Sequence, residues 1–131
     1  MSDQIKHECG IALIRLLKPL SYYKEKYGDV HYGLNKMYLL MEKQHNRGQD
    51  GAGLAIIKLD TQPGNAYFDR ERSVDKQAIK DIFNKVFSKF SNLSDKENDQ
   101  INNIDYLKNN YPYMGELLLG HLRYGTHGGN D

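Results

Sequence analysis

The spacing of hydrophobic positions divides the first third of the chain into a strand and a helix. Residues 9–17 are almost continuously apolar over a short run, which predicts a strand buried on both faces and ended by Lys18 and Pro19. From Tyr32 the apolar positions recur every three or four residues, which predicts a helix through about Lys43. The apolar face of this helix consists of Leu34, Met37, Tyr38 and Met41.

A polar segment separates this helix from a second predicted strand. Residues 44–53 contain three glycines and no apolar stripe, so we expect a loop there. Residues 54–59 predict a second buried strand, which the turn residues 60–64 close. Tyr67 and Phe68 are expected to start a third strand.

The second half of the chain predicts two helices and a last strand. Ser73 is a candidate N-cap for a helix, and residues 94–97 have the S-x-x-E form of a capping box, from which a weaker helix continues until Pro112. Residues 90–111 are rich in Asn, Asp, Lys and Ser and are expected to form a surface excursion of low local stability. Residues 116–124 predict the strand. The apolar face of the first of these helices consists of Ile79, Ile82, Phe83, Val86, Phe87 and Phe90.

Composition narrows the classes of protein that this pattern allows. A chain of 131 residues suits one domain, and its net charge of +1 gives no sign of a nucleic-acid partner. The longest apolar runs are far shorter than a membrane-spanning helix, and residues 1–8 lack the apolar core of a secretory signal. The single cysteine, Cys9, excludes an intrachain disulfide and a four-thiolate metal site. We therefore expect a cytoplasmic protein without a membrane segment.

Three polar clusters at the ends of predicted strands are candidates for chemistry: residues 7–10, 45–53 and 120–128. Taken singly, each has an ordinary explanation. A lone cysteine beside an apolar strand is most often a small buried hydrophobe, and arginines on loops are most often solvated or paired with a nearby carboxylate such as Asp50. His7 and Cys9 are too few to indicate a metal, and the glycine spacing matches neither phosphate-binding pattern, so no metal or cofactor is expected.

Taken together, the clusters indicate a more specific chemistry. A cysteine nucleophile near the N-terminus, Arg47 and Arg123 on separate loops, and the pair Thr126 and His127 could hold an amino acid and attack its side chain. A guanidinium is the best partner for an α-carboxylate because it binds the two oxygens together.

These residues resemble the glutaminase domain of class II glutamine amidotransferases, which are N-terminal-nucleophile hydrolases. Cys-Gly-Ile at 9–11 is similar to the start of the mature family domain. Residues 44–53 resemble the motif Q-H-R-G-Q-[DE]-[GA]-A-G of the amidophosphoribosyltransferase family, with Asn46 as an extra residue, and 120–126 resemble its G-H-x-R-Y-x-T. The resemblance implies an α+β fold, the αββα four-layer sandwich, incomplete in this chain. Residues 9–131 would be the N-terminal part of the domain, with an insertion at about 69–115.

The resemblance also implies the roles of individual residues. Cys9 would be the nucleophile, and Arg47, Arg123, Thr126 and His127 would bind glutamine. The base in this superfamily is the α-amino group of the nucleophile itself, so residues 1–8 would be a propeptide that is removed. The oxyanion donors and the carboxylate that binds the substrate amine lie beyond residue 131 in the family, so the 131-residue chain alone is expected to be inactive.

The implied reaction is hydrolysis of glutamine to glutamate and ammonia through a thioester on Cys9. In amidophosphoribosyltransferases the ammonia reacts with phosphoribosyl pyrophosphate in a C-terminal domain that requires Mg²⁺, and 5-phosphoribosylamine for purine synthesis results. The full-length enzyme would be a homo-oligomer. Two alternatives remain open: a glutaminase domain of the glucosamine-6-phosphate synthase type, which Thr126-His127-Gly128 also resembles, and an inactive binding module of the same fold.

Overall fold

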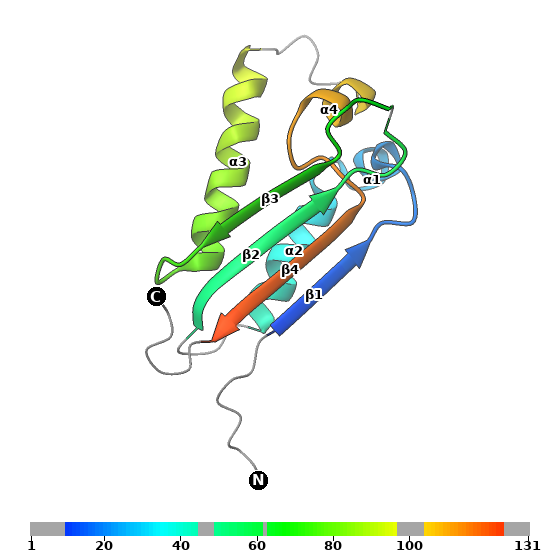
Figure 1. Cartoon of the computed structure of the whole chain (residues 1–131). Coiled ribbons are helices and arrows are strands. Elements are labelled where there is room, and N and C mark those ends of the chain that lie inside the picture. Colours follow the sequence, from blue (N-terminus) through cyan, green and yellow to red (C-terminus); the bar gives the residue numbers. More distant parts are fainter. Residues whose placement is uncertain (1–9, 45–48, 62, 97–103, 125–131) are drawn as a thin grey trace.

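The computed structural model describes residues 10–44, 49–61, 63–96 and 104–124. In these ranges the chain is a mixed α and β structure whose strands form one antiparallel sheet (Figure 1). The elements follow along the chain as β1 (Gly10–Arg15), α1 (Leu20–Tyr27), α2 (Tyr32–Lys43), β2 (Gln49–Ile57), β3 (Phe68–Ser73), α3 (Ala78–Lys96), α4 (Ile104–Asn110) and β4 (Leu117–Tyr124). The sheet has the order β1-β4-β2-β3, so the last strand lies between the first two.

The helices α2 and α3 cover one face of the sheet. α2 packs on β1 and β4, and α3 packs on β2 and β3. The apolar stripes predicted for both helices are confirmed, because Met37, Met41, Ile79 and Ile82 are all buried. A Cβ atom on Gly120 would lie 2.8 Å from Sδ of Met41, so the glycine lets α2 approach β4 closely. None of the helices in the described ranges is long and apolar enough to cross a membrane.

His31, which precedes α2, joins the two large helices. Its ring lies edge-on to Phe87 and Phe90 of α3, at centroid distances of 5.3 and 4.4 Å. Burial in this contact lowers the pKa of His31, and the carboxylate of Asp29, 3.6 Å from Nδ1, only partly opposes that shift.

The strand predicted at 9–17 exists as β1, but the expectation that it is buried on both faces is wrong. Ala12 is buried under α2, whereas Ile11 and Leu13 are 69% and 61% exposed. A continuous apolar run shows that both faces of a strand are apolar, but it does not show that both are covered. Here the described helices cover one face, and the side chains on the opposite face of the sheet, which we call the open face, are accessible.

Two further expectations for the first half of the chain need correction. The predicted loop at 44–53 is partly strand, because β2 begins at Gln49 and includes Gly51 and Gly53. Glycine is unfavourable in a strand in general, but here a Cβ atom on Gly53 would lie 2.4 Å from the His121 ring, and one on Gly51 would lie 3.1 Å from the backbone oxygen of Ser73. α1 was not predicted. It begins after Pro19 and ends at Gly28, whose φ of 76° suits glycine.

The segment after β3 also differs from expectation. Ser73 ends β3 instead of capping α3, and its hydroxyl donates to Asp81 at 2.6 Å. The capping box at 94–97 is wrong, because α3 continues through Ser94 to Lys96. The prediction that residues 90–111 form a surface excursion is wrong for α4 and the residue that follows it, since Leu107 and Tyr111 are 1% exposed. The insertion proposed for 69–115 stays a prediction. This range contains β3, which is a strand of the sheet, and α3, which packs on the sheet.

Candidate functional site

Three segments that are far apart in the sequence meet at one end of the sheet. β1 begins at Gly10, which pairs with Leu122 near the end of β4. β2 begins at Gln49, which pairs with Tyr124 at the end of β4. The starts of β1 and β2 therefore flank the end of β4, as Figure 1 shows.

The residues expected to carry the chemistry belong to these segments. Cys9 directly precedes β1, Arg47 precedes β2 by two residues, and Thr126 and His127 follow β4 within three residues. These four lie outside the described residues. Arg123 is described. It is the penultimate residue of β4, and its side chain lies on the open face.

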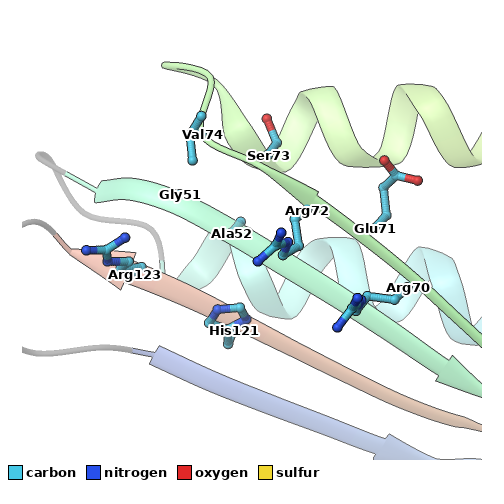
Figure 2. A pocket seen from close by; sticks show the side chains of 9 residues that line it. All are labelled: Gly51, Ala52, Arg70, Glu71, Arg72, Ser73, Val74, His121 and Arg123. Atoms are coloured by element: carbon cyan, nitrogen blue, oxygen red, sulfur yellow. The ribbon is translucent and has the colours of Figure 1, made fainter. Parts of the chain in front are cut away.

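Arg123 lines a pocket of about 610 Å³ at this end of the open face (Figure 2). Figure 2 shows Arg70 and Arg72 extending from β3 over β2, on the same side of the sheet as His121 of β4. Three guanidinium groups and an imidazole thus surround one hollow. The residues that line it are Gly51, Ala52, Arg70, Glu71, Arg72, Ser73, Val74, His121 and Arg123.

The charge of this pocket follows from the alternation of side chains along β3. Arg70 and Arg72 pair with Ala55 and Gly53 of β2 and share their face, whereas Asp69 and Glu71 belong to the helix side. A strand with the sequence F-D-R-E-R-S therefore places its cations on the open face and its carboxylates on the other. The pocket is basic and suits an anionic group such as a carboxylate.

The carboxylates on the helix side have partners there. Glu71 lies 3.8 Å from Nζ of Lys85 and 3.7 Å from Nζ of Lys89, both on α3. Its Oε1 also accepts a hydrogen bond of 2.8 Å from the hydroxyl of Tyr113, and Asp69 accepts the backbone N–H of Tyr113 at 3.0 Å. Burial, with the negative charge of Glu71, raises the pKa of Tyr113 far above its usual value. This phenol therefore stays a hydrogen-bond donor and holds Glu71 on the helix side.

The imidazole of His121 lies over the backbone of β2 at the floor of the pocket. A Cβ atom on Gly53 would be 2.4 Å from Cε1 of this ring and 2.7 Å from its Nδ1. No side chain fits at Gly53 while the ring keeps this position. The glycine of the second motif and the histidine of the third are thus in direct contact, which the sequence alone could not show.

Comparisons with protein-family models, curated proteins and solved structures found no match for this chain. Within the ranges that the structure describes, no three His, Cys, Asp or Glu side chains gather as metal ligands would.

Sequence reasoning missed four residues near this site. Arg70 and Arg72 could have been found from the alternation of charge along β3, once the strand was extended beyond Phe68. His121 is part of the third motif but had no role assigned. Gln44 is the first residue of the second motif but had no role assigned, and its place in that motif is the only signal for it.

Proposed function

We propose that this chain is the N-terminal part of the glutaminase domain of a class II glutamine amidotransferase, of the amidophosphoribosyltransferase type. The observation that carries the proposal is the meeting of the three motif-bearing segments at one end of the sheet. A nucleophile before β1 and two arginines beside β2 and β4 can act on one substrate only if these ends are neighbours. The strand order makes them neighbours.

The basic pocket supports the binding role of Arg123. Glutamine carries an α-carboxylate, and the guanidinium groups of Arg123 and Arg72 offer positive charge for that group in the same pocket. Arg47, Thr126 and His127 would complete the contacts to glutamine. The backbone at Gly51 adds space, because that residue has no side chain over the pocket floor.

The proposed mechanism begins when residues 1–8 are removed and Cys9 gains a free α-amino group. This amine takes the thiol proton, and the thiolate attacks the side-chain carboxamide of glutamine. The C–N bond breaks, ammonia leaves with the transferred proton, and a thioester of the γ-carboxyl group with Cys9 forms. Water then hydrolyses the thioester to glutamate and restores the thiol. The ammonia would react with phosphoribosyl pyrophosphate in a separate domain.

The open face supports the finer fold proposal, the αββα sandwich. In that architecture a second sheet packs on the face opposite the helices, and the part of the face that it covers is expected to be apolar. The open face presents Ile11, Leu13, Phe68 and Leu119, each at least 45% exposed. Large apolar side chains in neighbouring positions are expected where another layer packs.

The test uses the full-length protein. We expect intact-mass measurement to find a chain that begins at Cys9, and we expect Cys9→Ser to abolish glutamine hydrolysis while synthesis from added ammonia persists. An active preparation that still begins at Met1, or a Cys9→Ser variant that hydrolyses glutamine, would overturn the proposal.

Substitution of Arg123 tests the pocket separately. Arg123→Ala should lower kcat/KM for glutamine roughly 10- to 100-fold, since a hydrogen bond to a charged group contributes about 1.5–3 kcal/mol. Arg15→Ala is the matched control, because Arg15 is also an exposed arginine of the open face but lies at the opposite end of β1. Equal effects of the two substitutions would show that Arg123 acts only through general charge.

A further inference from the structure

Gln44 connects the end of α2 with the start of β1. It follows the last residue of α2, and its backbone N–H bonds to the carbonyls of Leu40 and Met41, each at 3.2 Å. α2 is itself fixed to the sheet through buried side chains that include Met41. The base of the Gln44 side chain therefore has a defined position relative to the sheet.

The side-chain amide of Gln44 contacts β1 at its first two residues. Nε2 donates a hydrogen bond of 3.1 Å to the carbonyl of Ile11. A Cβ atom on Gly10 would lie 2.5 Å from Oε1 of Gln44, closer than such atoms approach in proteins. β1 is an edge strand that pairs only with β4 among the described strands, so this amide adds a second attachment to its start.

We propose that Gln44 is a positioning residue for the site. It holds the start of β1, the residues that directly follow Cys9, and it directly precedes the segment that contains Arg47. One amide thus joins the end of α2 to the start of β1, and in this arrangement a side chain at position 10 would displace it. The role in glutamine hydrolysis rests on the proposed function, whereas the contact itself does not.

The contact predicts that substitutions at positions 10 and 44 are strongly coupled. Gly10→Ala places a methyl group against Oε1 of Gln44, so β1 or the amide must move. In a Gln44→Ala background the obstructing amide is gone, and the same methyl group should be tolerated. Gln44→Glu keeps the shape of the side chain but cannot donate to the Ile11 carbonyl.

The first measurement is the alkylation rate of Cys9 by iodoacetamide as a function of pH, made on the 131-residue chain, in which Cys9 is the only thiol. We expect Gly10→Ala to change this rate at least about threefold in the wild-type background and less than about 1.5-fold in the Gln44→Ala background, because contacting residues do not act additively. Gln77→Glu is the matched control, since Gln77 is exposed and distant in the sequence from both sites. Equal effects of Gly10→Ala in the two backgrounds would overturn the proposal.

The second measurement is the kcat and KM for glutamine of the full-length protein. We expect Gln44→Glu to lower kcat at least about tenfold with little change in KM, because a displaced nucleophile slows the chemical step without removing a substrate contact. An unchanged kcat in a protein that hydrolyses glutamine would overturn the positioning role. If the full-length protein does not hydrolyse glutamine but the alkylation rates are coupled, the proposed function fails and the contact between Gln44 and Gly10 stands.

Discussion

The buried ion pair between Lys108 and Glu116 gives the sharpest test of how the far end of the sheet is held. Nζ of Lys108 lies 2.7 Å from Oε2 of Glu116, and the two side chains are 17% and 8% exposed. Both groups also bond to Leu59 after β2: Oε1 of Glu116 accepts its N–H at 2.9 Å, and Lys108 donates to its carbonyl. The pair therefore ties α4 and the residue before β4 to the end of β2.

The perturbation is Glu116→Gln, which keeps the size and the oxygen that accepts the Leu59 N–H but removes the charge. The ammonium of Lys108 is then left without its carboxylate in a mostly buried position. Breaking a buried pair costs about 3–5 kcal/mol, and the partial exposure of Lys108 reduces this to about 2–3 kcal/mol. The double substitution Lys108→Met with Glu116→Gln removes the stranded charge and should recover all but about 1 kcal/mol.

The assay is equilibrium urea unfolding followed by circular dichroism, with the free energy of unfolding compared at an unchanged m-value. Lys89→Met is the control, because Lys89 makes an ion pair with Glu71 at 3.7 Å but is 54% exposed, and it should cost less than about 1 kcal/mol. A cost of Glu116→Gln no larger than that of this control, or a double substitution as destabilising as the single one, would show that the ion pair does not hold this end of the sheet.

Two further predictions follow from glycine contacts and from a buried histidine. Gly115→Ala should lower the free energy of unfolding in urea by about 3 kcal/mol, because its Cβ would lie 2.5 Å from the backbone oxygen of Ile57. Gly53→Ala should lower it by less than about 1 kcal/mol, because the exposed ring of His121 can turn away. Equal costs of the two substitutions would contradict this explanation. Because the pKa of His31 is lowered in the folded chain, the unfolded chain binds the imidazole proton more tightly, and stability should fall as the pH drops below about 6.5. Between pH 7.5 and pH 5 the melting temperature of His31→Phe should therefore fall less than that of the wild type. Parallel curves of melting temperature against pH would refute this role of His31.

Elements with a clear hydrophobic period were predictable from the sequence. The helix expected from Tyr32 to Lys43 has those bounds in α2, and the strand expected at 116–124 is β4 within one residue. In both cases local pattern and tertiary burial agree, because the apolar positions lie on the side that faces the core. α1 lacked such a stripe and was missed, since only Leu20 and Tyr23 are buried in it.

The rest depended on contacts that local pattern does not encode. Whether Ile11 and Leu13 are covered depends on which face of the sheet receives the helices. Gly51 and Gly53 have the sequence character of loop residues, yet they belong to β2 because they pair with Arg123 and His121 of β4. Arg70 and Arg72 belong to the basic pocket only because β3 pairs with β2 in this register.

The candidate site was predictable as three motifs but not as one place. The order of the motifs along the chain does not show which strand ends are neighbours. The three motif-bearing ends are neighbours because β4 lies between β1 and β2 in the sheet. The roles of Cys9, Arg47, Thr126 and His127 stay predictions, because these residues lie outside the described ranges. Arg123 lines a basic pocket at the shared end, and its contact with a substrate carboxylate stays a prediction.

The position of β4 in the sheet has a consequence for the order of folding events. β1 pairs only with β4 among the described strands, and the paired residues are more than one hundred positions apart in the sequence. Closing a loop of that length loses conformational entropy before the stabilising strand contacts form, so this pairing should form late and slowly. On a ribosome, β1 has no strand partner until β4 has emerged. Any chemistry that needs all three motifs must therefore wait until translation has passed β4.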